Sequence, residues 1–249
     1  MLEDVACADF VVADVFGRIA RRYDLLCDLF SFGTHRLWKR RVAALIVAQP
    51  WSDLLEVAAG PDAIALRVAQ IRSSASCRRI TISDICPTML ALAQRRSRAL
   101  GTALAFRQLD AENLAPVPAA SVDVYCISLA LKICDRDKAL AEAYRVLRPG
   151  GRLVALEASV LPWPRLQLAY LACISAWVTV IGSIATGGDA PVYARLVRAI
   201  REVPSAEAIS AELVDIGFAN VAFERLQLGV AAIYTATKPD ERLEPTCGL

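Results

Sequence analysis

Short apolar segments alternate with amphipathic segments through the middle of the chain, and this alternation constrains the fold more than any other feature. The predicted strands are 53–58, 78–83, 105–109, 122–128 and 152–157, and the predicted helices are 63–71, 87–100 and 136–147. A tight turn is predicted at Pro149–Gly151, because proline fixes φ and glycine permits positive φ. The connections are long enough for crossovers, so the pattern predicts an α/β fold with a parallel sheet covered on both faces.

Both ends of the chain depart from this alternation. Ser205 caps a predicted helix with apolar residues at helical spacing, and Gly217 ends it. Two closely joined strands follow, which implies an antiparallel edge on the sheet. The two strands are predicted at 221–226 and 230–237, and the helices that precede the first strand at 10–30 and 34–48.

The sequence contains neither an internal repeat nor a low-complexity linker, so we expect one domain over residues 1–249. Within it, N-terminal helices occupy residues 1–50 and lid or substrate helices occupy residues 160–203. Residues 239–249 are polar and contain two prolines, which predicts a flexible tail.

The composition is apolar for a chain with this pattern: 56% of the 249 residues are hydrophobic and only 22% are charged. The net charge of +2 is too small to indicate a nucleic-acid binder. The first residues, MLEDVACADFVVADVF, carry acids where a signal peptide needs a basic stretch. The sequence therefore predicts no export and a cytoplasmic protein.

Cysteine and histidine usage exclude several kinds of chemistry. The chain has eight cysteines without a Cys-x-x-Cys pair, so we expect reduced and mostly buried thiols rather than a disulfide framework. They are Cys7, Cys27, Cys77, Cys86, Cys126, Cys134, Cys173 and Cys247. The single histidine, His35, argues against a His-based metal site and against a Ser-His-Asp triad. No metal is expected.

The loops at the carboxyl ends of the predicted strands are the expected ligand site, because open α/β sheets bind ligands there. Asp84 ends the second strand, 24 residues after Gly60, which is close to the usual interval for an acid that accepts both ribose hydroxyls. This indicates an adenosine-containing ligand. The alternative role for Asp84 is a negative charge at the start of helix 87–100. Asp110, after the third strand, either reaches an adenine amino group or caps the turn at residues 111–113.

Two long stretches resemble a known family. They are Tyr23-Asp-Leu-Leu-Cys-Asp-Leu-Phe-Ser-Phe-Gly-Thr-His-Arg-Leu-Trp38 and Arg145-Val-Leu-Arg-Pro-Gly-Gly-Arg-Leu-Val-Ala-Leu-Glu-Ala-Ser159. Both are similar to signatures of the ubiquinone/menaquinone biosynthesis C-methyltransferases, and residues 135–140 and 207–230 follow the same layout, so the likeness covers roughly residues 14–238. It implies a class I (Rossmann-like) fold that uses S-adenosylmethionine (SAM), with a seven-stranded, mostly parallel sheet. It also implies methylation of a ring carbon of a polyprenylated quinol.

The first loop departs from the family pattern. The family has a glycine-rich loop through which the backbone approaches the methionine part of SAM, whereas this chain has Glu56-Val-Ala-Ala-Gly60-Pro-Asp62 with one glycine. Asp62 stands where the last glycine normally lies, and we expect its charge near the SAM carboxylate to weaken or rearrange binding. Aspartate tolerates left-handed backbone geometry, so the loop itself can still form.

The chain differs from the family pattern at three further places. Leu26-Cys27 replaces Met-Asn, Tyr234 replaces a histidine, and Lys132-Ile133 replaces an Arg-Asn pair at the quinol site. Lys132 preserves a cation, whereas Ile133 removes a polar partner.

The resemblance and the strand ends together give a set of expected site residues. The expected cofactor-binding residues are Glu56, Ala58, Gly60, Asp62, Asp84, Ile85, Asp110, Ala111 and Ser128. Tyr23, His35 and Lys132 are the catalytic candidates at the mouth, where a base or phenolate-stabilising group is needed. Each has a structural alternative: helix packing for Tyr23, a surface or capping role for His35, and a solvated loop position for Lys132.

Between Arg165 and Asp189 lie 23 residues without a charge, long enough to resemble a transmembrane span. A single crossing would separate parts of one sheet, so residues 166–188 are interpreted instead as a helix over the substrate mouth or at a membrane surface. Basic residues between 18 and 41 offer charge for such contact. They are Arg18, Arg21, Arg22, Arg36, Lys39, Arg40 and Arg41.

The sequence thus predicts a SAM-dependent methyltransferase that acts on a lipophilic small molecule, most simply a quinol-like or phenolic ring, with peripheral membrane contact. Two alternatives stay open. One is a homologue that no longer methylates and serves as a lipid-binding accessory protein of a biosynthetic complex. The other is a phospholipid N-methyltransferase.

Overall fold

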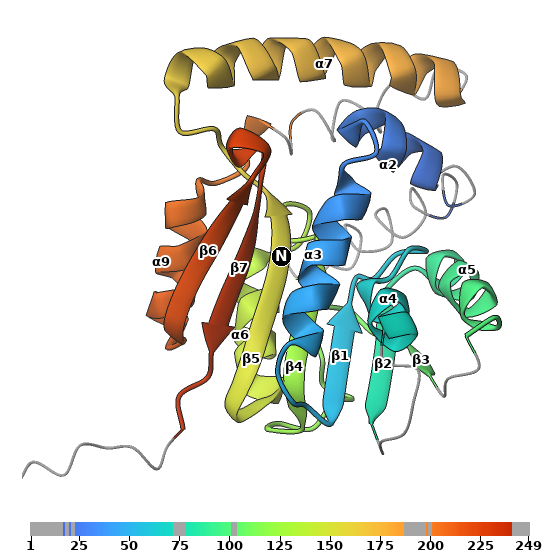
Figure 1. Ribbon diagram of the computed structural model, residues 1–249, viewed down its shortest axis with the longest axis vertical. Coiled ribbons are helices and arrows are strands. Elements are labelled where there is room, and N and C mark those ends of the chain that lie inside the picture. The colour runs from blue at the N-terminus through green and yellow to red at the C-terminus, as the bar shows by residue number, and fades with distance from the viewer. Residues whose placement is uncertain are drawn as a thin grey trace, which may run out of the picture.

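One twisted seven-stranded sheet forms the centre of the computed structural model, which describes residues 17, 20, 23–71, 78–100, 104–186, 198 and 201–240 (Figure 1). The strands are β1 (Asp53–Val57), β2 (Arg79–Asp84), β3 (Ala105–Gln108), β4 (Val122–Ser128), β5 (Leu147–Ala158), β6 (Ala219–Leu226) and β7 (Ala231–Thr237). Their order is β3-β2-β1-β4-β5-β7-β6. Strands β1 to β5 are parallel, and β7 is antiparallel to both neighbours. The predicted α/β fold with an antiparallel edge is confirmed.

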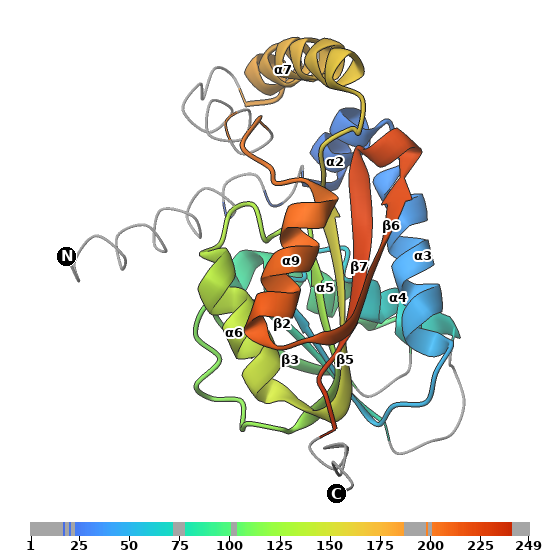
Figure 2. The same cartoon turned by 90° about the vertical axis from the view of Figure 1, so that its left-hand side faces the viewer.

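Helices cover both faces of the sheet. They are α2 (Tyr23–Ser31), α3 (His35–Val47), α4 (Ile64–Ile71), α5 (Pro87–Ser97), α6 (Arg136–Val146), α7 (Pro164–Thr186) and α9 (Ala206–Ile216), with a short 3₁₀ turn, η2 (Gln227–Gly229). Figure 2 shows α6 and α9 on one face and α3 and α4 on the other. The predicted caps of α9 are present, because the Ser205 hydroxyl accepts from the Ala208 amide at 3.2 Å and Gly217 adopts φ 109°.

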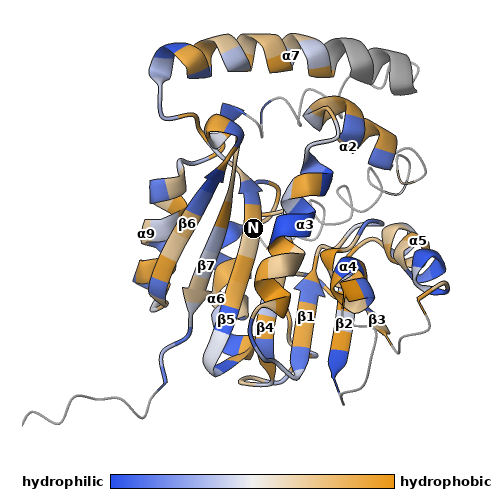
Figure 3. Cartoon of the chain, viewed as in Figure 1, coloured by the Kyte–Doolittle hydropathy of each residue, from blue (hydrophilic) through white to orange (hydrophobic). Residues whose placement is uncertain are grey.

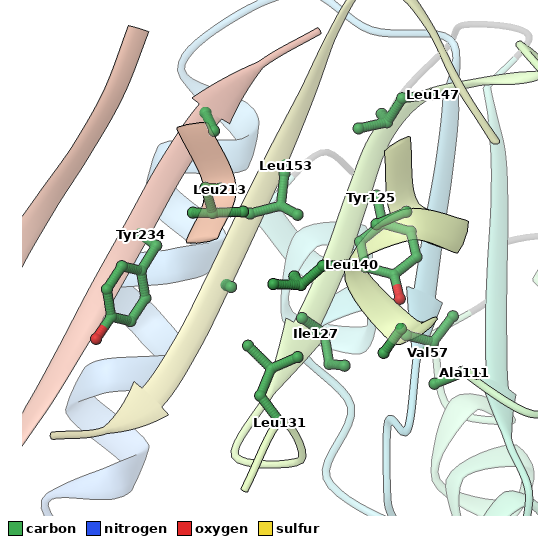
Figure 4. Close-up of a cluster of buried hydrophobic side chains, with 14 of the residues drawn as sticks. Val57, Ala111, Tyr125, Ile127, Leu131, Leu140, Leu147, Leu153, Leu213 and Tyr234 are labelled. Atoms are coloured by element: carbon green, nitrogen blue, oxygen red, sulfur yellow. The ribbon is translucent and has the colours of Figure 1, made fainter. Parts of the chain in front are cut away.

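Each face of the sheet has its own apolar core. On the α6/α9 face, Val57, Tyr125, Ile127, Leu140 and Leu213 pack together (Figure 4). On the other face, apolar side chains of α3 and α4 meet β1, β2 and β4. All five residues of β1 are buried, as expected for a strand covered on both faces, and they include two acids, Asp53 and Glu56, beside Leu54, Leu55 and Val57. Each fully buried aliphatic side chain contributes about 1.5–3 kcal/mol through the hydrophobic effect.

The predicted tight turn at Pro149–Gly151 is wrong, because these residues lie inside β5. The pairing with β4 jumps there, from Leu147 opposite Val122 to Arg152 opposite Val124. Lys238 pairs with the irregular segment through two backbone hydrogen bonds, to Gly150 and Gly151. Pairing with Lys238, near the other end of the described chain, thus makes a segment with a turn-like sequence part of a strand. Gly150 still has the expected positive φ, 76°.

Helix α7 crosses one end of the molecule and rests on α2 (Figure 1). The Trp177 indole nitrogen donates to the Leu29 carbonyl at 2.9 Å, and the Trp177 ring stacks on Phe32 with centroids 5.5 Å apart. Ile174 and Val178 are buried at this contact. Within the described part of the chain, no helix combines the length and apolar character needed to cross a membrane.

Several sequence expectations lie outside the described residues. These are most of helix 10–30 before Tyr23, including Arg18, Arg21 and Arg22, residues 187–197, 199 and 200 of the predicted lid segment, and residues 241–249 of the tail. The described cysteines are free thiols, namely Cys27, Cys86, Cys126, Cys134 and Cys173. Cys86 and Cys126 are buried, Cys27 and Cys134 are half-buried and Cys173 is exposed, so the expected burial holds for two of these five. Cys7, Cys77 and Cys247 lie outside.

Candidate active site

A cleft of about 730 Å³, open to solvent, lies where β1, β2 and β4 end. It is lined by Tyr23, Ala58, Gly60, Asp84, Ile85, Met89, Leu109, Asp110, Ala111, Glu112, Ser128, Leu129, Ala130, Ile133 and Cys134. Seven of the nine expected cofactor residues line it, and Tyr23 joins them from α2. The expectation from strand topology therefore locates the cleft correctly.

Asp84 joins two of the loops that form the cleft. Its carboxylate accepts from the Gly60 amide and from the Cys86 amide, each at 2.8 Å. Burial raises the pKa of Asp84, although these two backbone hydrogen bonds favour the charged form. A carboxylate has about four lone-pair sites, so two remain for a ligand. Asp84 thus binds the start of α5 and also faces the cleft, and its contact with ribose stays a prediction.

The β1–α4 loop turns sharply at two residues that line the cleft. Ala58 has φ 47° and Gly60 has φ 61°, both in the left-handed region. Glycine adopts this conformation without a steric cost, whereas in alanine the Cβ comes too close to the backbone carbonyl oxygen. A Cβ at position 60 would lie 3.8 Å from Cε1 of Tyr23. The glycine that remains in this loop therefore lies in the wall of the cleft, close to the ring of Tyr23.

Glu56, expected to bind the cofactor, does not line the cleft. Its fully buried carboxylate accepts from the first amides of α4, Ile64 at 2.9 Å and Ala65 at 2.6 Å. Burial raises the pKa of Glu56 to about 7, against the stabilising effect of these two hydrogen bonds. An acid at a helix N-terminus compensates the positive end of the helix dipole. Glu56 thereby fixes the end of the β1–α4 loop without bordering the cleft.

Asp62 also lies outside the lining, contrary to the expected position of its charge beside the cofactor. Its carboxylate is 2.9 Å from a guanidinium nitrogen of Arg67 and 3.6 Å from Nζ of Lys39. Although burial alone would raise the pKa of Asp62, these cations hold it below the usual value. The charge that replaces a family glycine is therefore neutralised away from the cleft.

Asp110 caps the turn that follows β3. Its Oδ1 accepts from the Glu112 amide at 2.9 Å, and its carbonyl accepts from the Asn113 amide at 3.2 Å. The turn presents Asp110, Ala111 and Glu112 to the cleft. The capping role left open by the sequence is thus present, and the same residue borders the ligand space.

Of the three catalytic candidates, Tyr23 is the one that lines the cleft. The neighbouring Cys27 thiol, to which it is hydrogen-bonded, and burial raise the pKa of Tyr23 well above the ordinary value. The phenol is therefore protonated at neutral pH and able to donate a hydrogen bond, but it is a poor base.

His35 does not line the cleft. It is buried at the start of α3, with Nδ1 2.8 Å from Oγ of Ser31. Ser31 donates its own hydroxyl proton to the Cys27 carbonyl at 2.6 Å, so it accepts from the histidine, which places the proton on Nδ1. Burial lowers the pKa of His35. The side chain is a neutral link between α2 and α3, and neither a surface nor a mouth residue.

Lys132 is likewise outside the lining and is not a solvated loop lysine. Its Nζ lies 2.9 Å from Oε1 of Glu157, which is 1% exposed, and it also donates to the Leu129 carbonyl. The Lys132 amide donates to the same carboxylate at 3.2 Å. The pair fixes the loop after β4, whose residues line the cleft. The neighbouring Ile133 does line it.

Several cleft residues are absent from the expected set of site residues. Leu129, Ala130 and Ile133 belong to the loop after β4, which is expected to border the ligand, whereas the others are Met89, Leu109, Glu112 and Cys134. Leu109 and Glu112 adjoin predicted site residues, so extending each strand-end loop by one residue identifies them. Met89 belongs to α5 and is oriented by tertiary packing, for which the sequence carries no local signal.

Comparison with known sequences finds a family and relatives that this chain resembles. The model of the ubiE/COQ5 methyltransferase family matches residues 4–238. The chain is 37% identical to a ubiquinone/menaquinone biosynthesis C-methyltransferase UbiE from Rhizobium meliloti, over 92% of this chain and 89% of that protein. It is 37% identical to a protein of the same name from Brucella anthropi, over 92% and 87% of the two chains.

Comparison of structures agrees at the level of the fold. A SAM-dependent methyltransferase from Thermotoga maritima matches 90% of this chain and 98% of its own, with a TM-score of 0.60 and 16% identity. At this identity the likeness concerns the class I fold alone.

Proposed function

Because the chain belongs to the ubiE/COQ5 methyltransferase family, we propose that it transfers the methyl group of SAM to a quinol-like or phenolic ring on a lipophilic small molecule. The observation that carries the proposal is the cleft at the strand ends, where Asp84 both binds the Gly60 amide and borders the ligand space. The family is SAM-dependent, and its relatives named UbiE are C-methyltransferases.

The cleft suits SAM in shape and charge. Three of its described lining residues are acids, Asp84, Asp110 and Glu112, and none is lysine or arginine, which favours a ligand with a sulfonium cation. Asp84 would accept the ribose hydroxyls and the turn at Asp110 and Ala111 would border the adenine. Ala58 and Gly60 would lie along the methionine part, with Ile85 and Ser128 completing the wall.

When bound, SAM supplies an electrophilic methyl group, and the protein must hold an acceptor atom in line with it at about 3 Å. Four apolar lining residues offer a surface for a ring, namely Leu129, Ala130, Ile133 and Cys134. Tyr23, protonated and at the cleft, would donate a hydrogen bond to the ring oxygen. His35 and Lys132 would act through their neighbours, by fixing α2 and the β4 loop, rather than by contact with the acceptor.

Calorimetric titration with SAM is the first test. We expect the wild-type protein to bind SAM with a micromolar dissociation constant, and Asp62→Gly to bind within a few-fold of it, because Asp62 faces Lys39 and Arg67. Binding that appears only after Asp62 is replaced would favour the non-methylating accessory protein.

Substrate assays come second. The protein is incubated with methyl-labelled SAM and either a demethylated quinol with a short prenyl chain or phosphatidylethanolamine. Labelled quinol, with the label on a ring carbon by mass spectrometry, is the expected product. Labelled phospholipid alone would favour the N-methyltransferase alternative.

We also propose that the α7 end of the molecule contacts a membrane surface. Large apolar side chains are exposed there, with Phe32 74%, Leu168 70% and Leu228 66% accessible. Leu25, Leu37, Trp163 and Leu166 are exposed on the same group of elements. Arg40 and Arg165 add exposed positive charge, whereas Arg36 and Arg41 are paired with Asp28 and Glu224. Apolar and cationic side chains together suit an anionic lipid surface.

Flotation with liposomes tests this contact. We expect binding to vesicles that contain phosphatidylglycerol, weaker binding to phosphatidylcholine alone, and a clear loss in the double variant Phe32→Ser, Leu168→Ser. The matched control is Val214→Ser on α9, an equally apolar residue that is 56% exposed. Equal flotation of all three proteins would count against membrane contact.

A further inference from the structure

The β1–α4 loop is contacted on two sides by residues from the N-terminal helices. Tyr23 of α2 lies over Gly60 on the cleft side. On the side away from the cleft, Nζ of Lys39 in α3 donates to the Asp62 carbonyl at 2.6 Å. Arg96 of α5 donates to the Pro61 carbonyl at 3.0 Å. Carbonyls at the end of the loop are therefore held by cations from two helices.

Lys39 differs from these neighbours in its burial. The residue is 6% exposed, and its ammonium group contacts both the carbonyl and the carboxylate of Asp62. A buried ammonium group is costly unless it is paired and hydrogen-bonded, so its position is strongly determined by Asp62. Conversely, loss of the ammonium group leaves a carbonyl of this loop without its charged donor.

Packing of α3 against α4 delivers Lys39 to this position. Val42, Ala43 and Ile46 are fully buried and belong to one apolar cluster with Ala63 and Ile64 at the start of α4. The first turns of α3 are hydrophilic and its later turns are hydrophobic (Figure 3). The apolar turns fix the helix, and the lysine one turn earlier reaches the loop.

From this geometry we infer that Lys39 is a positioning residue for the β1–α4 loop at the proposed SAM site. Lys39 holds the Asp62 end of this loop, so that Ala58 and Gly60 keep their left-handed conformations at the cleft. This rests on the proposed SAM site. It assigns to an N-terminal helix, outside the alternating core, control of cofactor affinity. It also explains how a loop that has lost its last glycine keeps a defined shape.

Calorimetric SAM titration of the full chain tests the inference. We expect Lys39→Met to weaken SAM binding by about tenfold, as the loss of a charged hydrogen bond predicts, while the turnover number at saturating SAM changes less than about twofold. Lys39→Arg, which restores a cation, is expected to recover most of the affinity. The matched control is Arg40→Met, which removes an exposed neighbouring cation and is expected to bind SAM like the wild type.

Thermal unfolding of the SAM-free proteins separates positioning from folding. If Lys39→Met does not fold, Lys39→Gln, which keeps a shorter donor, is measured instead with the same expected direction. Asp62→Ala keeps the carbonyl that Lys39 contacts and is expected to bind SAM more tightly than Lys39→Met.

The outcomes distinguish a failure of the proposed SAM site from a failure of the positioning role of Lys39. A wild-type protein that does not bind SAM overturns the proposed function. Wild-type binding with unchanged affinity in Lys39→Met, or a loss that Lys39→Arg does not reverse, overturns only the positioning role.

Discussion

The carboxylate of Asp84 accepts a hydrogen bond of 2.8 Å from the backbone amide of Gly60, and so links the ends of β1 and β2 at the edge of the cleft. The link lies between the residue expected to bind ribose and the residue expected to approach methionine. The shape of the loop therefore depends on this carboxylate, and so does the proposed recognition of SAM. Four measurable consequences follow from this and similar contacts.

Replacing Asp84 by alanine is expected to weaken SAM binding by at least about a hundredfold, since the ribose partner and the Gly60 acceptor are lost together. Calorimetry measures the dissociation constant. Asp215→Ala, an exposed aspartate on α9, is the control and should leave binding unchanged. Comparable SAM affinities of the two variants would mean that Asp84 does not contribute to SAM binding.

Glu56 makes folding stability depend on pH. Burial raises its pKa from 4.5 to about 7 in the folded protein, so the folded chain holds this proton over a range where the unfolded chain has lost it. The resulting stabilisation is complete below pH 4.5, declines as pH rises, and is lost above pH 7. The difference is about 3 kcal/mol.

Glu56→Gln removes that titration. The free energy of unfolding, measured with urea, is expected to change less with pH in the variant than in the wild type between pH 4.5 and 7. Because other groups titrate in both proteins, the difference between the two curves is the relevant quantity, and parallel curves would contradict the assignment.

Lys132→Met is expected to destabilise the fold by about 3 kcal/mol, because it leaves the buried Glu157 carboxylate without its cation. The double variant Lys132→Met, Glu157→Gln should recover a large part of this loss. Chemical denaturation of the four proteins of the cycle gives the coupling energy. A stability loss in Lys132→Met that the second substitution leaves unchanged would mean that the ion pair is not its cause.

Opposite substitutions in one loop give a matched pair. Ala58→Gly relieves a left-handed alanine with φ 47° and is expected to stabilise the protein by up to about 1 kcal/mol. Gly60→Ala places a Cβ at φ 61° beside Tyr23 and is expected to destabilise it by about 1 kcal/mol and to weaken SAM binding. Denaturation midpoints are compared at equal m-values. Effects of the same sign would argue against the loop geometry.

Local pattern was sufficient for the sheet and for the place of the cleft. Leu54, Leu55 and Val57 mark a strand that is covered on both faces, and the spacing from Gly60 to Asp84 is fixed by one helical crossover. Such features need only neighbouring residues and the topology of parallel strands.

Side-chain direction could not be predicted in the same way. Glu56 and Asp62 belong to the right loop, yet they point to the α4 amides and to Lys39 and Arg67. Lys132 follows the right strand and turns to Glu157, 25 residues later. In each case a partner distant in sequence or hidden in packing determines where the charge lies, and such partners carry no local signal.

Helix α2 joins two contacts, since Tyr23 at its start borders the cleft while Leu29 near its end and Phe32 just after it contact Trp177 of α7. A chimera that imports α7 from a relative should therefore import residues 29–32 with it. Without them, the new α7 is expected to displace the helix that carries Tyr23, so that a change made at one end of the molecule reaches the wall of the cleft.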